Sequence, residues 1–419
     1  MDAIWKANMN HESCLVVRLR WANFILITGL LFSIGLSSVQ AGPREQAKRI
    51  HERLAAVPPS ETVLSDMASQ IVAGNSIGAA MTAMENGDFY NVILKNFVAP
   101  WTNEAESVFV PLNDYTATVI GIVRDNGDFR EILSGDILYV AASGLGLPGY
   151  SNTNNNLYQA LEDQRIDLQT NLVATTQSSV TGLATEATAG ITTTRAAAQA
   201  FFIDGTNRAM LRFTLKNHLC TDLETLKDIT LAADRIRQDV SRSPGGDSRI
   251  YMNNCIGCHN GMDPLSQAYA FYDFVHDVDN DPEGINGSLS YNNVGVLDPE
   301  TGSRVKKKYL INASNFKFGY ITADEQWVNY WRVGQNANLG WSNSLNGSGQ
   351  GAKSMGQELA NSNAFASCQV KKVFQQVCLR NPVDLTDRNQ INASTASFKA
   401  NNYNLKQVFA ETAAYCMGD

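Results

Sequence analysis

Hydrophobic and polar residues alternate with a helical period along much of this chain. Residues 43–54, 61–72 and 114–124 have apolar side chains on one face, which predicts amphipathic helices. Ser60 precedes the second stretch, in the position of a helix N-cap. Further helices are expected at 76–84, 89–97, 129–133, 195–203, 207–220 and 405–415. The pattern therefore predicts a mainly α-helical protein.

Changes in composition divide the chain into segments. We expect an N-terminal helical domain at 42–140 and a connector at 141–194, rich in Thr, Ala, Gly and Asn. The connector has too few large apolar residues for a core of its own. Residues 195–419 are again helical in pattern, apart from the stretch 280–350. That stretch is rich in Asn, Gly and Ser and predicts long loops with short strands.

Residues 1–41 have the features of a signal peptide for export. Three basic residues precede an apolar stretch at 21–36, and Val39 and Ala41 fit a cleavage site after Ala41. The apolar stretch is shorter than the roughly 20 residues of a membrane-spanning helix. We therefore expect a periplasmic or otherwise exported protein with no integral membrane span after cleavage, and an uncleaved membrane anchor is the alternative.

The charge of the chain narrows the possible partners. Without residues 1–41 it has 30 Lys and Arg against 39 Asp and Glu, a net charge of −9. Such acidity makes nucleic acid and anionic lipid poor partners. A redox partner protein is compatible with it. The oligomeric state stays open.

One motif in the chain carries recognisable chemistry. Residues 255–259 read Cys-Ile-Gly-Cys-His, a C-x-x-C-H segment typical of covalent haem attachment. We predict that Cys255 and Cys258 bind the vinyl groups of one haem c. His259 would be the proximal ligand of the iron, whose chemistry is usually redox chemistry.

Two other interpretations of the cysteine pair were weighed. A structural zinc site needs two more ligands, and the sequence has no second C-x-x-C and no H-x3–5-H. A thioredoxin-like dithiol expects a βαβ context and no following His. Both are weaker than the haem interpretation.

The surroundings of the motif suggest further roles. Pro264 suits a loop whose backbone carbonyl accepts the free imidazole N–H of His259, or simply a helix stop. Met355, at the start of a predicted helix, is our candidate for the distal iron ligand. The alternatives are His276, Met417 and His218. Four aromatic residues would line a porphyrin face or belong to the core: Tyr269, Phe271, Tyr272 and Phe274.

Four cysteines remain for disulfides in an oxidising compartment. Cys368 and Cys378 lie on one predicted helix, about 15 Å apart along its axis, whereas a disulfide needs Cα atoms roughly 6 Å apart. Each must therefore pair with Cys220 or Cys416. We favour Cys220–Cys368 with Cys378–Cys416 over the exchanged pairing, and free thiols are the remaining possibility.

Two stretches resemble the planctomycete-type cytochrome c family. The first is Cys-Ile-Gly-Cys-His-Asn-Gly-Met-Asp-Pro-Leu at 255–265, and the second is Phe-Ala-Ser-Cys-Gln-Val-Lys-Lys-Val-Phe at 365–374. The resemblance covers roughly residues 195–419. It implies a cytochrome c-like helical haem domain with associated C-terminal helices, and it supports Cys255, Cys258 and His259 as haem-binding residues. The long Asn/Gly-rich loops depart from the compact form of such a domain.

The sequence thus favours an exported mono-haem c-type cytochrome that transfers electrons. Two alternatives remain, a haem-dependent oxidoreductase acting on an unknown substrate and a haem-based binding or sensor module. A two-haem peroxidase is disfavoured, because only one C-x-x-C-H is present.

Overall fold

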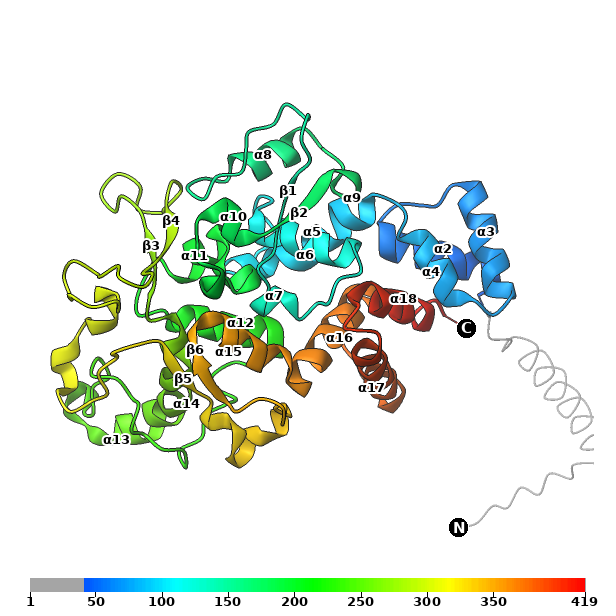
Figure 1. The fold of residues 1–419 in the computed structure, drawn as a ribbon. Coiled ribbons are helices and arrows are strands. Elements are labelled where there is room, and N and C mark those ends of the chain that lie inside the picture. Colours follow the sequence, from blue (N-terminus) through cyan, green and yellow to red (C-terminus); the bar gives the residue numbers. More distant parts are fainter. Residues whose placement is uncertain (1–40, 419) are drawn as a thin grey trace, which may run out of the picture. The chain divides into compact units, whose positions relative to one another are not determined.

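The structure, a computed structural model, describes residues 41–418 of the chain. The predicted signal peptide, apart from Ala41, lies outside this range. Residues 43–417 fold together as one unit, drawn as a ribbon in Figure 1. Helices provide most of the regular structure and the strands are few and short, so the fold is mainly α, as predicted.

The helices largely follow the periodic pattern of the sequence. Those predicted at 61–72, 114–124 and 405–415 are confirmed to the residue. The hydroxyl oxygen of Ser60 accepts the N–H of Val63 at 3.3 Å and caps the first of them. The α-helices are α2 (Pro43–Ala55), α3 (Glu61–Val72), α4 (Ser76–Ala83), α5 (Lys95–Val98), α6 (Asp114–Arg124), α7 (Glu131–Ser134), α8 (Asn156–Asp163), α9 (Leu168–Asn171), α10 (Gln177–Thr181), α11 (Arg195–Phe201), α12 (Arg208–Leu219), α13 (Ser248–Ile250), α14 (Ile256–Ser266), α15 (Gly351–Ala360), α16 (Asn363–Cys378), α17 (Leu385–Ala400) and α18 (Leu405–Tyr415). Within residues 41–418, none of the helices combines the length and the apolar character needed to cross a bilayer.

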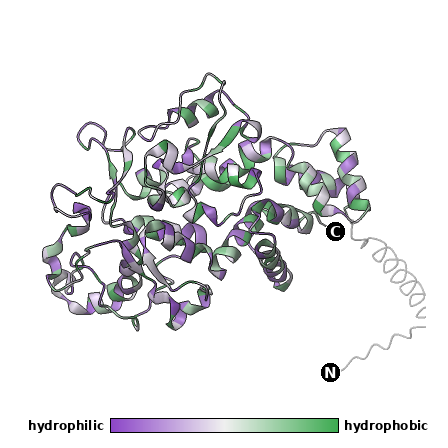
Figure 2. Cartoon of the chain, viewed as in Figure 1, coloured by the Kyte–Doolittle hydropathy of each residue, from purple (hydrophilic) through white to green (hydrophobic). Residues whose placement is uncertain are grey.

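Helices from the two ends of the described chain pack against each other. α18 contacts both α2 and α4, and α16 contacts α2. The rings of Phe89 and Phe409 meet edge to face at 5.2 Å, and Arg49 donates to the carbonyl of Met417 at 2.7 Å. Figure 2 shows hydrophobic and hydrophilic residues alternating along α2 and α3, as amphipathic helices require. The N-terminal helices therefore share a hydrophobic core with the C-terminal ones.

Helix α6 lies at the centre of this core, with residues 114–123 all buried. At its N-terminus the carboxylate of Asp114 accepts the backbone N–H groups of Arg195 and Ala196, at 2.7 and 3.0 Å. These two N–H groups open α11 and have no partner within that helix. The buried carboxylate thus joins the start of α11 to α6.

The strands form three two-stranded antiparallel sheets. They are β1 (Leu138–Ala141) with β2 (Leu172–Thr175), β3 (Tyr272–Val275) with β4 (Ser288–Tyr291), and β5 (Gln326–Val328) with β6 (Ser348–Gln350). The expected connector supplies β2, and its Thr-rich end at 187–194 is buried against α6 and α7. The short strands β4, β5 and β6 fall in the Asn- and Gly-rich stretch 280–350, where short strands were expected.

Two disulfides connect distant parts of the chain, and both were predicted. Cys220 is joined to Cys368, with Cα atoms 5.3 Å apart, and Cys378 to Cys416, with Cα atoms 5.5 Å apart. The first links α12 to α16 and the second links α16 to the end of α18. Such bonds form in oxidising compartments, so they are compatible with an exported protein.

Glu325, just before β5, makes the stability of the fold depend on pH. Burial raises the pKa of its carboxyl group to about 7, although the Tyr291 hydroxyl and Arg304 act to lower it. Between its ordinary pKa of about 4.3 and 7, the folded protein holds a proton that the unfolded chain has released. The free energy of unfolding must therefore fall as the pH rises through this range.

Replacing Glu325 by Gln keeps an oxygen that can accept the Tyr291 hydroxyl, 3.2 Å away in the structure, and removes the charge. We expect Glu325→Gln to leave the free energy of unfolding unchanged at pH 4 and to raise it by about 2 kcal/mol at pH 8. Urea unfolding at both pH values measures the difference. Equal effects at the two pH values would contradict this assignment.

Candidate haem site

The C-x-x-C-H motif lies at the start of helix α14. The short α13 (Ser248–Ile250) and a π-helical turn (Tyr251–Cys255) lead into it. Cys255 and Cys258 are three residues apart, which places their side chains on one side of the helix. Both thiols are free and partly buried, whereas the other four cysteines within residues 41–418 form disulfides.

The Cys258 thiol does not have the character of a redox dithiol. Burial raises the pKa of Cys258, against the lowering effect of nearby Lys227. Its Sγ lies 3.6 Å from the carbonyl oxygen of Leu223, to which the thiol donates. Redox-active cysteines instead have lowered pKa values. The dithiol interpretation is correspondingly weakened.

His259 follows the two thiols with one ring nitrogen engaged. Its Nδ1 lies 3.2 Å from Oδ1 of Asp263, one helical turn further along α14. The imidazole is 21% exposed, whereas Asp263 is fully buried. With the proton on Nδ1, facing the carboxylate, Nε2 carries the lone pair that can bind a metal. In that tautomer Nε2 is the nitrogen that could bind an iron.

The partner of His259 differs from the one expected. The sequence suggested a backbone carbonyl in a loop near Pro264, or a helix stop at that residue. Instead α14 continues through Pro264 to Ser266, and the Asp263 carboxylate faces the ring. Proline is disfavoured inside a helix because it removes one hydrogen bond. The tertiary contacts of Asp263 hold the helical path in spite of this.

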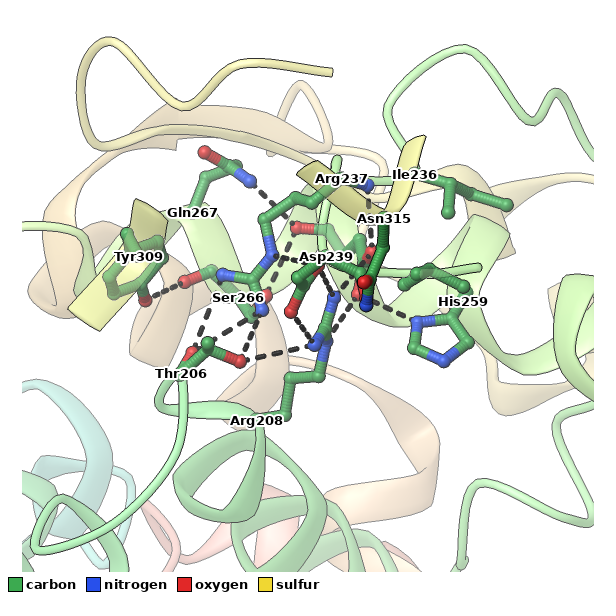
Figure 3. A network of polar contacts seen from close by, with 12 residues as sticks. Thr206, Arg208, Ile236, Arg237, Asp239, His259, Ser266, Gln267, Tyr309 and Asn315 are labelled. Carbon is green, nitrogen blue, oxygen red and sulfur yellow. Dashed lines mark hydrogen bonds and ion pairs between the residues drawn. The ribbon is translucent and has the colours of Figure 1, made fainter. Parts of the chain in front are cut away.

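Asp263 is fixed by a network of polar contacts, of which Figure 3 labels Arg208, Arg237 and His259 among other members. Arg208, at the start of α12, donates to both carboxylate oxygens, from Nε at 2.7 Å and from Nη2 at 2.9 Å. The backbone N–H of Arg237 donates to Oδ2 at 3.1 Å. Arg208 also forms a two-point ion pair with Asp239, at 2.5 and 2.9 Å. Burial alone would raise the pKa of Asp263, but Arg208, His259 and Arg237 lower it well below its ordinary value, so the group is ionised.

Arg237 belongs to the same network and connects other segments to α14. Its side chain is almost fully buried and donates to the Thr206 hydroxyl at 2.6 Å. Its guanidinium carbon lies 4.8 Å from the centre of the Tyr309 ring, and the Tyr309 hydroxyl donates to the carbonyl of Ser266 at the end of α14. The segments around residues 206, 237 and 309 are thereby tied to the motif helix.

Two glycines let other segments approach α14 closely. The carbonyl of Gly257 accepts the N–H of Asp228 at 2.9 Å, and a Cβ at Gly257 would lie 2.6 Å from the Lys227 side chain. A Cβ at Gly261 would lie 2.1 Å from the indole nitrogen of Trp331. Sequence reasoning missed this packing. The glycines at these two positions were a visible signal of it.

Two apolar side chains near the motif are exposed. Ile229, 63% exposed, would touch a Cβ built at Gly257 of the motif, and Met252, 54% exposed, precedes the motif by three residues. Exposed apolar side chains of this size are the surface that a porphyrin ring can cover. Together with the paired thiols and the oriented imidazole, they make the residues present fit a haem c.

The candidates for the distal ligand occupy different places. Met355 lies on α15 and is buried in the main hydrophobic core. His218 is also buried, and its Nε2 is paired with the Tyr115 hydroxyl at 3.0 Å, so this nitrogen is already in use. His276 follows β3, and Met417 packs against the main core. The assignment of Met355 stays a prediction.

The aromatic residues after the motif belong to the protein core. Tyr269 and Tyr272 are buried against Phe202, with ring centres 5.3 and 5.9 Å away. Phe271 and Phe274 are buried as well. Of the two roles considered for these side chains, core packing is therefore the one they have.

Within residues 41–418, no three side chains among His, Cys, Asp and Glu are grouped so as to hold a metal ion. Comparisons of this chain with protein-family models, with curated proteins and with solved structures find no match.

Proposed function

We propose that this protein is an exported mono-haem c-type cytochrome that passes electrons to or from a redox partner protein. Cys255 and Cys258 hold the haem through thioether bonds, and His259 binds the iron. The group supplies a metal centre that changes oxidation state with its ligands in place. Exposure of the imidazole and of nearby apolar side chains leaves this site close to the surface, where a partner can approach.

One observation carries the proposal. Helix α14 presents two free thiols on one side, and His259 beside them has its Nδ1 engaged by Asp263 and its Nε2 available. A structural zinc site would require further ligands at the same place. A redox dithiol would have no need of a positioned imidazole. The combination fits haem c better than either.

The test is the visible spectrum of the full chain, produced in a bacterium with a working cytochrome c assembly apparatus. We expect a coloured protein whose pigment stays with the polypeptide in acidified acetone. A colourless product, or pigment that passes into the solvent, would overturn the proposal.

The same preparation separates electron transfer from the alternatives. Spectra of the oxidised and reduced protein are recorded with and without carbon monoxide. An unreactive, six-coordinate iron with a long-wavelength sulfur-to-iron band would support electron transfer and a methionine such as Met355 as distal ligand. Binding of carbon monoxide would favour a haem-dependent oxidoreductase or a sensor instead.

A further inference from the structure

The carboxylate that faces His259 is buried and is held in place by N–H donors from two other segments. Its Oδ1 lies 3.2 Å from Nδ1 of the imidazole, and its remaining contacts come from Arg208 and from the backbone of Arg237. We propose that Asp263 is a positioning residue that fixes the Nδ1–H form of His259 and lowers the reduction potential of the haem. The inference rests on the proposed function and concerns how the same site is tuned.

The physical reason lies in the strength of the hydrogen bond. A carboxylate accepts a ring N–H more strongly than a neutral carbonyl does. As the N–H is drawn toward Asp263, electron density on Nε2 increases, and the imidazole becomes a better donor to iron. The more positive, oxidised iron gains most from a stronger donor. The oxidised state is therefore favoured, which lowers the potential.

The surrounding hydrogen bonds hold the Asp263 carboxylate in position to accept the N–H of His259. Arg208, which comes from α12, neutralises part of the charge of Asp263. The same guanidinium group also makes a two-point contact with Asp239. Arg237 contributes a backbone N–H, which has no charge of its own to gain or lose. These contacts fix the carboxylate in place while Oδ1 still faces the imidazole. Four residues of spacing on one helix set the distance.

Asp263 also has a purely structural role, because it ties α14 to α12 and to residue 237. Asp239 provides the matched control. It binds the same guanidinium group in the same two-point manner and is also largely buried, with a side chain 8% exposed. The carboxylate that faces the His259 ring is that of Asp263. A variant at Asp239 therefore perturbs Arg208 and, at 3.8 Å, the Nε of Arg237, but it removes neither partner of the Asp263–His259 pair.

The experiment measures the reduction potential of haem-loaded Asp263→Asn, Asp263→Glu and Asp239→Asn proteins. Asp263→Asn is expected to favour reduction about tenfold, a rise of ~59 mV for one electron. Asp263→Glu, which restores a carboxylate, should recover most of the native potential, and Asp239→Asn should change it less than threefold. The chemical shift of Nδ1 in His259, measured in the reduced, diamagnetic protein, should change in Asp263→Asn and remain the same in Asp239→Asn.

Two results would overturn the inference. One is an unchanged potential in Asp263→Asn, and the other is an equal rise in Asp239→Asn, which would assign the effect to Arg208. If Asp263→Asn fails to fold, the native protein alone still tests the inference. The chemical shift of Nδ1 in His259 must then differ from that of a histidine bonded to a backbone carbonyl and be displaced towards the value of an imidazolate. Failure of the proposed function looks different, since no covalently bound haem would be present to titrate.

Discussion

Alanine at both Cys255 and Cys258 is expected to give a folded protein that carries no covalently bound haem. Neither thiol belongs to a disulfide and both are only partly buried, so we expect the fold to persist without them. Alanine is also the strongest helix former, and the motif opens a helix. We expect the free energy of unfolding to fall by about 1–2 kcal/mol. The denatured polypeptide should carry no pigment at all. Haem staining after denaturing electrophoresis, together with thermal unfolding followed by circular dichroism, measures both quantities.

The two single substitutions are the controls for this experiment. Cys255→Ala and Cys258→Ala each leave one thiol on the same side of α14, so each is expected to retain haem through one thioether bond. Their spectra should shift, because one vinyl group then stays unmodified. Covalent pigment that persists in the double variant would show that haem is attached elsewhere or that the motif has another function.

Removing the Cys220–Cys368 disulfide is expected to have the largest effect on stability. The bond closes a loop of 148 residues, and the chain-entropy relation gives about 5 kcal/mol for a loop of this length. Total stabilities are typically only about 5–15 kcal/mol. The Cys220→Ala, Cys368→Ala variant should therefore unfold at a much lower urea concentration than the native protein, or be unfolded at 37 °C.

The second disulfide supplies the comparison. Cys378–Cys416 closes a loop of 38 residues, for which the same relation gives about 4 kcal/mol. The free energy of unfolding should thus fall more when the Cys220–Cys368 disulfide is removed than when the Cys378–Cys416 disulfide is removed. A larger loss from the shorter loop would mean that packing around α18, rather than loop entropy, dominates.

Local signals were enough to predict many of the helices. Helix α3 begins after Ser60 and follows one apolar face, and α18 follows the same kind of pattern from Leu405. One of the three possible disulfide pairings could also be excluded, because a helix containing both Cys368 and Cys378 rules out a bond between them, whereas the choice between the other two was a preference that the structure confirms. Signals of this kind depend on residues close together in sequence.

The features that sequence reasoning missed depend on distant residues. A loop or helix stop near Pro264 was expected, yet α14 continues to Ser266, and Arg208 and Arg237 contact Asp263 from segments far away in sequence. The pairing of β1 with β2 likewise joins segments about 30 residues apart. By contrast, the His259–Asp263 contact was visible as a four-residue spacing, and only its helical setting was needed to find it.

The packing of α18 against α2 and α4 has a consequence for how the protein matures. A polypeptide threaded through a translocation channel from its N-terminus delivers α14 well before α18. Until α18 arrives, α2 and α4 lack the contacts that this helix makes with them. On the proposed function, Cys255 and Cys258 would therefore reach the haem-attachment enzymes before this part of the core is complete, so that covalent attachment would precede its completion.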